Sequence, residues 1–158
     1  DLPGAPRVGL DLDMASGDGD PTNGTKNTFN QLFPSTHPFF GYMDLVGRQN
    51  INSFSPNVRW NLGDTAWFRA AWCDFNLYND HDALYNAQGA VSLQDPTGNS
   101  GNHVGQEWDF TLGIKPSFLA PHSDFLFGYS YFNPGDFVEN QGSGSRPQLF
   151  YMQYTFNF

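Results

Sequence analysis

Several charged side chains lie at positions that alternate with apolar residues along the chain. The residues in such positions are Arg7, Asp11, Asp13, Arg59, Arg69, Asp109 and Lys115. Because side chains alternate across a strand, these charges should fall on one face of a sheet, where we also expect Glu107 and Asp74. Such a face would select ions or charged polymers if it lined a pore. Alternatively, the charges would pair across neighbouring strands and hold the wall rigid.

Oxygen-bearing side chains gather in GDGDPTNGT, residues 17–25, where Asp18, Asp20, Asn23 and Thr25 are ligand types that Ca²⁺ prefers. The spacing resembles the opening of an EF-hand, but the flanking helices and the distal Glu are absent, so a solvated acidic turn is the alternative. Asp80, His81, Asp82 and His103 include transition-metal ligand types without a fixed motif. We therefore expect no metal or cofactor, and we keep Asp18 and Asp20 as the calcium candidate.

Enzymatic motifs are missing from the chain: there is no nucleophile elbow, no phosphate-binding loop and no zinc motif. The net charge of −9 and the scattered placement of the seven Lys and Arg residues argue against nucleic-acid binding. The single Cys73 cannot form an internal disulfide. We expect neither an enzyme nor a nucleic-acid-binding protein.

The charges above lie in segments with a two-residue hydrophobic period, which is typical of strands with one apolar face. We expect strands near 7–15, 51–62, 66–78, 107–117, 124–132 and 147–158. In 66–78 the pattern is ambiguous: if Phe68 and Trp72 point outward, Arg69, Cys73 and Phe75 point inward. No segment has a convincing helical period.

The expected connections alternate in length. Long ones span 16–50, 79–106 and 133–146, whereas Gly63-Asp64-Thr65 is very short. Long loops are uncommon in compact soluble domains. Outer-membrane barrels combine short periplasmic turns with longer extracellular loops, and their strands alternate apolar and polar residues. The sequence thus predicts an all-β, antiparallel transmembrane barrel whose apolar face meets lipid, with the long connections outside.

Six strands are too few to close a barrel, for which about eight is the usual minimum. We expect residues 1–158 to be the C-terminal portion of one larger barrel domain, with a barrel shared between several copies as the alternative. A soluble carbohydrate-binding β-sandwich is a further alternative. The closing strand, with Tyr154, Phe156 and Phe158, resembles the C-terminal assembly signal of bacterial outer-membrane proteins.

The first long connection contains FNQLFPSTHPFFGYMDL, residues 29–45, which is too apolar for an ordinary solvated loop. We expect it to form a plug or constriction in the pore, or to pack on the rim, and we expect His37 and Asp44 to hydrogen-bond there. The residues expected to form it are Phe29, Phe33, His37, Phe40 and Asp44.

The connection as a whole, SGDGDPTNGTKNTFNQLFPSTHPFFGYMDLVGRQNI, resembles the C-terminal region of the alginate-export family of outer-membrane barrels. The matching positions are Thr28, Phe29, Leu32, Phe33, Pro34, His37, Phe40, Gly41, Asp44 and Asn50. The resemblance implies a monomeric barrel of about 16–18 strands, a size that leaves an aqueous channel. It also implies passage of polysaccharide or other hydrophilic solutes across the bacterial outer membrane.

Our expectation is therefore a channel or porin that passes hydrophilic solutes, with alginate-type polysaccharide export as the specific case. The alternative is a structural barrel whose loops plug the pore and bind a surface protein. Expected partners are outer-membrane lipids, the barrel-assembly machinery and the solute. The mixed charge of the inward set departs from the basic pore that an anionic polymer favours, so specificity for alginate stays open.

Overall fold

The computed structural model describes residues 4–20, 22–34, 37, 39–116 and 123–156. Its elements are β1 (Arg7–Ala15), β2 (Ile51–Asn61), β3 (Ala66–Leu77), β4 (Ala83–Tyr85), β5 (Val91–Gln94), β6 (His103–Ile114), β7 (Ser123–Pro134), α1 (Asp136–Asn140) and β8 (Gln148–Phe156). Six of the eight strands lie where the alternation predicted them. The shift is largest for β6, which begins at His103 instead of near residue 107.

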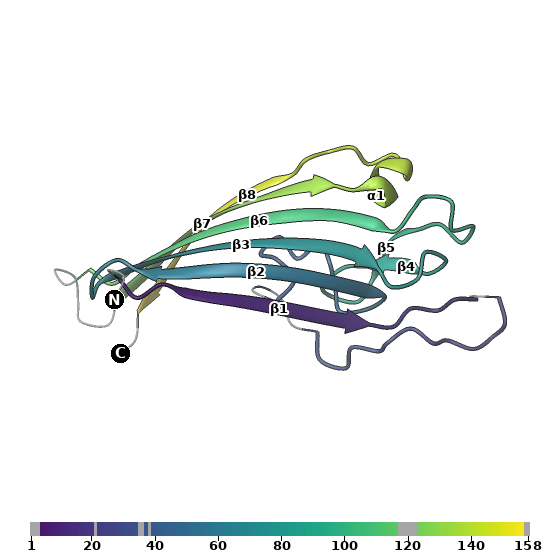
Figure 1. The fold of residues 1–158 in the computed structure, drawn as a ribbon, viewed down its shortest axis with the longest axis horizontal. Helices are drawn as coiled ribbons and strands as arrows, with labels where there is room; N and C mark the ends of the chain where they lie inside the picture. The colour runs from purple at the N-terminus through teal and green to yellow at the C-terminus, as the bar shows by residue number, and fades with distance from the viewer. Residues whose placement is uncertain (1–3, 21, 35–36, 38, 117–122, 157–158) are drawn as a thin grey trace.

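These six strands form one antiparallel sheet in the order β1-β2-β3-β6-β7-β8, and the sheet is long and curved (Figure 1). The prediction of an all-β, antiparallel fold is confirmed. Within the described residues the sheet is open, because β1 and β8 each have a single neighbour. No closed barrel is therefore formed by this part of the chain, and the larger barrel stays a prediction.

Strand register separates the sheet into two faces. The bare face carries the apolar set, in which Leu112 pairs with Phe127 and Phe127 with Met152. Its members are Val8, Leu10, Leu12, Met14, Phe54, Val58, Trp60, Phe68, Ala70, Trp72, Trp108, Phe110, Leu112, Ile114, Phe125, Phe127, Tyr129, Tyr131, Phe150, Met152, Tyr154 and Phe156. On the edge strands, Val8 is 85% exposed and Phe150 75% exposed. This face has no covering layer in the described residues.

The opposite face, which we call the covered face, carries the charged positions. On β3 the ambiguity is resolved: Phe68 stacks on Phe110 of the bare face, whereas Cys73 and Phe75 are buried on the covered face. The expectation that Asp74 joins the covered face is wrong. It pairs with Phe54 and Gln106 on the bare face, because alternation along β3 places every even-numbered residue there.

Asp74 is tolerated on the bare face because donors surround it. Its carboxylate accepts hydrogen bonds from Asn76 Nδ2 (2.9 Å) and Gln106 Nε2 (3.1 Å) and lies 3.1 Å from His103 Nε2. These residues lie at the end of the sheet that carries the long connections. The bare face is thus apolar over most of its length and becomes polar at this loop end.

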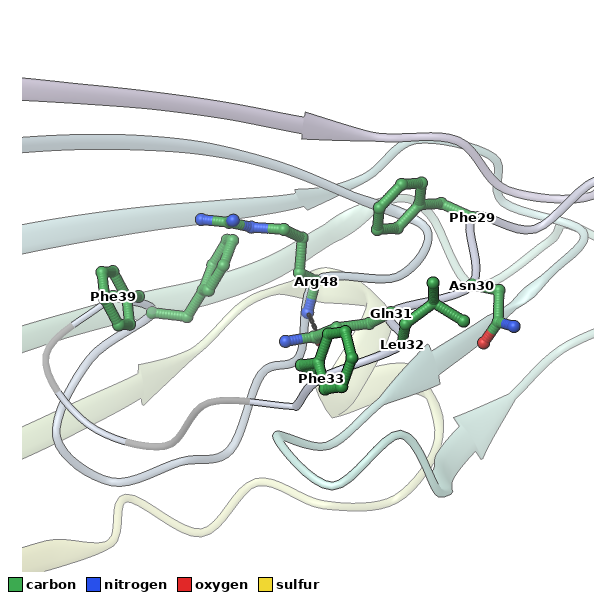
Figure 2. Close-up of a pocket in the computed structure, with 8 residues that line it drawn as sticks. Phe29, Asn30, Gln31, Leu32, Phe33, Phe39 and Arg48 are labelled. Atoms are coloured by element: carbon green, nitrogen blue, oxygen red, sulfur yellow. Dashed lines mark hydrogen bonds between the residues drawn. The ribbon is translucent and has the colours of Figure 1, made fainter.

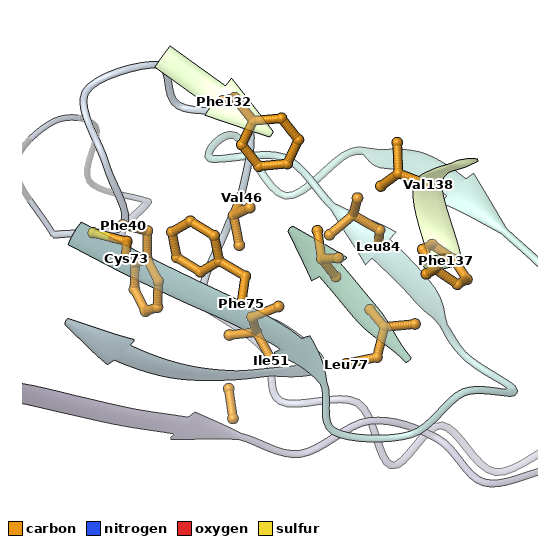
Figure 3. Close-up of a cluster of buried hydrophobic side chains, with 12 residues drawn as sticks. Phe40, Val46, Ile51, Cys73, Phe75, Leu77, Leu84, Phe132, Phe137 and Val138 are labelled. Carbon is orange, nitrogen blue, oxygen red and sulfur yellow. The ribbon is translucent and has the colours of Figure 1, made fainter. Parts of the chain in front are cut away.

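A small hydrophobic core lies at the loop end, between the covered face and the long connections (Figure 3). It includes Ile51, Phe75 and Leu77 from the sheet, Leu84 from β4 and Phe137 from α1. The β4–β5 hairpin and α1 lie inside connections that were predicted only as long loops. Their short lengths leave no measurable hydrophobic period. No helix in the described part of the chain is long and apolar enough to cross a membrane.

Candidate functional site

Residues 39–49, which we call the covering segment, form the last part of the first long connection and lie across the covered face. Phe40 packs against Phe75 of β3, with ring centroids 6.5 Å apart. Tyr42 stacks on Tyr151 of β8 at 5.0 Å and an interplanar angle of 12°. The segment therefore reaches from the middle of the sheet to its last strand.

Glu107 of β6 fixes the centre of the covering segment. Its side chain is completely buried, and Oε1 accepts a hydrogen bond from the backbone N–H of Met43 at 2.9 Å. Oε2 is buried without a hydrogen-bond partner among the described residues. Gly41 makes the approach possible, since its φ is +80° and a Cβ there would lie 2.4 Å from the carboxyl carbon of Glu107. Both conditions favour glycine.

Arg48 fixes the other end of the covering segment. Its Nη2 lies 2.8 Å from Asp13 of β1, and its guanidinium lies 5.0 Å from the Phe40 ring centroid. Asp13 is thus one of the predicted charges on the covered face, and it pairs with the loop. The predicted contact between His37 and Asp44 is present: His37 N–H donates to Asp44 at 2.7 Å, and His37 Nδ1 lies 3.1 Å from the same carboxylate.

Aromatic side chains of the first connection border an open cleft of about 420 Å³ beside the covering segment (Figure 2). Phe29, Phe33 and Phe39 line it together with Arg48. Phe33 is 88% exposed, so it is not part of a core. Of the residues proposed for a plug, Phe29, Phe33 and Phe40 line this cleft, whereas His37 and Asp44 contact each other outside it. Their function as a constriction stays a prediction.

Three arginines form a row across the covered face. Arg7 of β1 pairs directly with Arg59 of β2, and Arg59 pairs directly with Arg69 of β3. None of them has a carboxylate partner among the described residues. The row continues through Thr111, Gly128 and Tyr151, where Tyr42 covers it. This arginine row is open on β1–β3 and closed on β8.

The acidic positions lie nearer the loop end and are satisfied locally. Asp11 accepts a hydrogen bond from Asn57 Nδ2 at 3.0 Å, and Asp109 is buried and accepts one from Ser130. Lys115 lies 3.8 Å from Asp124 of the neighbouring β7, so cross-strand pairing holds for this lysine. In the described residues, the arginine row has no such pairing with a carboxylate of a neighbouring strand. Arg69 nevertheless lines one open pocket together with Asp11, Asp13 and Arg48, so this part of the covered face carries charges of both signs.

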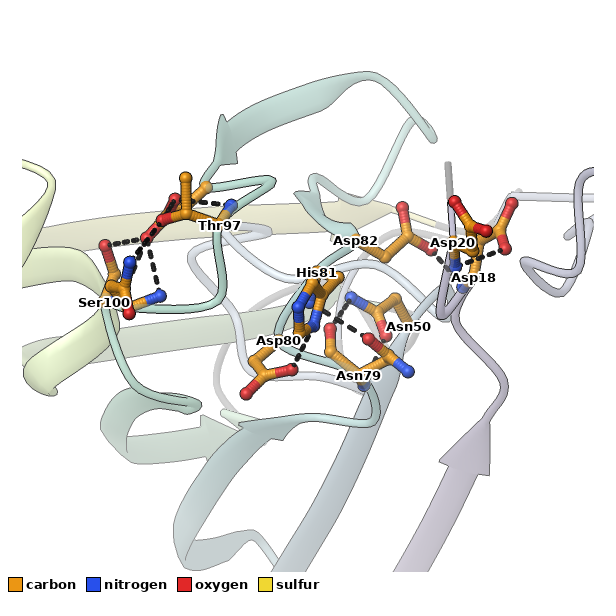
Figure 4. Close-up of polar contacts among 11 residues, drawn as sticks. Asp18, Asp20, Asn50, Asn79, Asp80, His81, Asp82, Thr97 and Ser100 are labelled. Atoms are coloured by element: carbon orange, nitrogen blue, oxygen red, sulfur yellow. Dashed lines mark hydrogen bonds and ion pairs between the residues drawn. The ribbon is translucent and has the colours of Figure 1, made fainter. Parts of the chain in front are cut away.

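The calcium candidates Asp18 and Asp20 are engaged by their own loop (Figure 4). Asp18 Oδ1 accepts from Asp20 N–H at 3.2 Å, and Asp20 Oδ1 accepts from Thr22 N–H at 3.0 Å and from its hydroxyl at 2.6 Å. The Thr22 hydroxyl holds the pKa of Asp20 below its ordinary value. Among the described residues, no three His, Cys, Asp or Glu side chains are grouped to hold a metal ion.

Asp82 and Asn50, whose roles the sequence did not reveal, join the long connections. Asp82 Oδ2 accepts from the backbone N–H of Asp18 and from the Thr28 hydroxyl, although we had grouped Asp82 with possible metal ligands. Asn50 is fully buried with φ +50°, and its amide bonds the backbone of Asn79 and Ala83. The sequence signal available for Asn50 was its place in the family pattern, which gave no partner.

The terminal aromatic residues Tyr154 and Phe156 lie on β8 and on the bare face. Tyr154 packs on Phe125 with ring centroids 5.0 Å apart. Phe158 lies outside the described residues. Recognition of this strand during assembly stays a prediction.

No curated protein matches the chain. The alginate export family, in contrast, matches residues 1–152, which is nearly the whole chain, and this match supports a role in polysaccharide export. The arginine row, the covering segment and the bare face all lie within the matched residues, and the chain belongs to the alginate export family.

Proposed function

We propose that this chain forms part of a β-barrel in the bacterial outer membrane and that the barrel conducts an anionic polysaccharide through an aqueous lumen lined by the covered face. The observation that carries the proposal is the row of Arg7, Arg59 and Arg69, which have no carboxylate partner among the described residues.

Like charges directly opposite each other on neighbouring strands are destabilising. The arginine row contains two such pairs in sequence, Arg7 with Arg59 and Arg59 with Arg69. A passing carboxylate would offset this repulsion, and the planar guanidinium matches a carboxylate with two parallel hydrogen bonds. A uronate polymer carries one carboxylate on each sugar, so it fits a row of such groups.

The bare face supports the membrane part of the proposal. Over most of the length of the strands, its apolar side chains continue from β1 to β8, as lipid contact requires. In lipid, backbone donors and acceptors must pair within a closed sheet. The edges of β1 and β8 therefore need further strands, which we assign to the rest of the barrel. Outer-membrane lipids and the barrel-assembly machinery are the partners that this arrangement requires.

A second candidate is a structural barrel whose loops close the pore and bind a surface protein. The covering segment favours it, because the segment lies across the covered face and buries Glu107 completely. The exposed phenylalanines beside the cleft would then meet the partner. The two candidates differ in whether the folded protein conducts ions.

The test is the single-channel conductance of the intact protein in planar bilayers, with and without an alginate oligomer. Protein whose electrophoretic mobility changes on heating, as folded barrels show, serves as the input. Stable conductance with chloride preference that the oligomer blocks is the expected result. Conductance with cation preference and no block would contradict the polysaccharide proposal, and folded protein without conductance would favour the structural barrel.

A further inference from the structure

We propose that Trp67 is a positioning residue that holds the guanidinium of Arg59 in place for a carboxylate of the passing polymer. This inference rests on the proposed function and names a residue that shapes the same site. It is based on the surroundings of Arg59, on the packing of the Trp67 ring and on Gly113, which pairs with Trp67.

Arg59 is the central member of the arginine row. It has arginines directly opposite it on both neighbouring strands and no carboxylate partner among the described residues. Its guanidinium carbon lies 4.0 Å from the centroid of the Trp67 ring. Stacking uses the flat face of the guanidinium, so the N–H groups at its edge stay available to an anion.

Trp67 differs from most aromatic residues of the sheet in the face on which its side chain lies. Most aromatic side chains of the sheet lie on the bare face, whereas Trp67 lies on the covered face and pairs with Gly113 of β6. A Cβ on Gly113 would lie 2.2 Å from Cε2 of the indole. The ring therefore lies against the bare backbone of β6, and Gly113 provides the space for it.

The contact of Gly113 with Trp67 and the contact of Trp67 with Arg59 together link β6 to the guanidinium. Gly113 leaves room for the Trp67 ring, and the ring packs against the Arg59 guanidinium without neutralising its charge. A long arginine side chain in solvent loses rotamer entropy when a ligand fixes it. A side chain already held on an aromatic ring loses less, so binding of a carboxylate becomes tighter.

The decisive test is a double-mutant cycle in the intact protein, with block of the single-channel current by an alginate oligomer as the measurement. Trp67→Leu should weaken the block about fivefold, in line with an ordinary cation–π contact. Arg59→Gln should weaken it more. In the Arg59→Gln background, Trp67→Leu should change the block less than twofold, because the contact is already gone. Equal factors in both backgrounds, or no effect of Trp67→Leu, would overturn the proposal.

Matched variants separate positioning from folding. Trp67→Phe keeps an aromatic face and should retain most of the block, whereas Gly113→Ala should displace the indole and act like Trp67→Leu. Trp72→Leu alters a tryptophan of the same strand on the bare face and should leave the block unchanged. A loss of block in Trp72→Leu equal to that in Trp67→Leu would indicate a general structural effect and refute the inference.

The polysaccharide proposal fails separately if the oligomer does not block the unaltered protein. The reversal potential in a KCl gradient then decides the role of Trp67 with chloride as the probe. Support is a lower chloride preference in Trp67→Leu that disappears in the Arg59→Gln background. An unchanged reversal potential in Trp67→Leu would overturn the inference.

Discussion

The covered face has two regions that treat their charges in opposite ways. In the arginine row, Arg7, Arg59 and Arg69 face one another without carboxylate partners among the described residues. Nearer the loop end, Glu107 and Asp109 are buried and receive hydrogen bonds from Met43 N–H and the Ser130 hydroxyl. Glu107 holds the covering segment through Met43 N–H, Asp109 is bonded within the sheet to Ser130, and we propose that the arginines receive the ligand.

Gly41→Ala should release the covering segment, because its Cβ would meet the Glu107 carboxyl group and its φ is +80°. We expect the free energy of unfolding in urea to fall by roughly 2–3 kcal/mol, from backbone strain and the lost hydrogen bond. Trypsin should then cleave faster after Arg48.

Gly24→Ala is the matched control for this prediction. Gly24 has nearly the same φ, +79°, but nothing lies within 4 Å of its Cβ position. It should cost only the backbone strain, on the order of 1 kcal/mol. Equal losses in the two variants would show that the contact with Glu107 contributes nothing to the position of the segment.

The stack of Tyr42 on Tyr151 should couple the covering segment to β8. In a double-mutant cycle of Tyr42→Ala and Tyr151→Ala, we expect an interaction free energy of about 0.5–1.5 kcal/mol by urea unfolding. Additive effects of the two substitutions would mean that the ring contact does not contribute to docking.

Asp13→Asn should alter the charge of the covered face and leave the free energy of unfolding nearly unchanged. Asp13 pairs with Arg48, and both side chains are partly exposed, at 28% and 39%, so the unfolding free energy should change by less than about 1 kcal/mol. The chloride preference of the channel should rise, because one negative charge is lost and Arg48 is left without its partner. A large loss of stability with unchanged selectivity would show that the pair of Asp13 and Arg48 is structural and does not influence selectivity.

Asp95 should give the smallest effect, in a loop away from both regions. Hydrogen bonds from Thr97 and Ser100 hold the pKa of Asp95 well below its ordinary value. Because the pKa is lower in the folded protein, the stabilisation is present above the unfolded pKa of about 3.9 and is lost as the pH falls through the folded value. The difference in melting temperature between the unaltered protein and Asp95→Asn should therefore be present at pH 7 and shrink in strong acid. A difference that grows in acid would contradict this assignment.

Local alternation carried most of the information about the sheet. The two-residue period placed β1 at Arg7–Ala15 as observed and gave the faces of β6, β7 and β8. It failed at the start of β6, where a register shift beside Phe75 and Asn76 and a glycine at position 105 interrupt the pattern. It also missed β4, β5 and α1, which are held by the loop-end core and not by their own periodicity.

The candidate site was harder to predict from the sequence than the strands were, because it depends on the register between neighbouring strands. The charged positions were identified, but their division into an arginine row and a group of buried acids is set by the pairing of Arg7 with Arg59 and of Arg59 with Arg69. Single-strand patterns hold no information on that alignment. The same is true of Tyr42 on Tyr151 and of Trp67 over Gly113, which are contacts between distant segments.

Whether the arginine row lines the conduction path can be measured from the reversal potential in a KCl gradient. The intact protein is compared with the triple variant Arg7→Gln, Arg59→Gln, Arg69→Gln. The structure predicts chloride preference for the unaltered protein and cation preference for the triple variant, in which the acidic side chains of the covered face remain. An unchanged reversal potential in a folded triple variant would show that the arginine row does not line the conduction path.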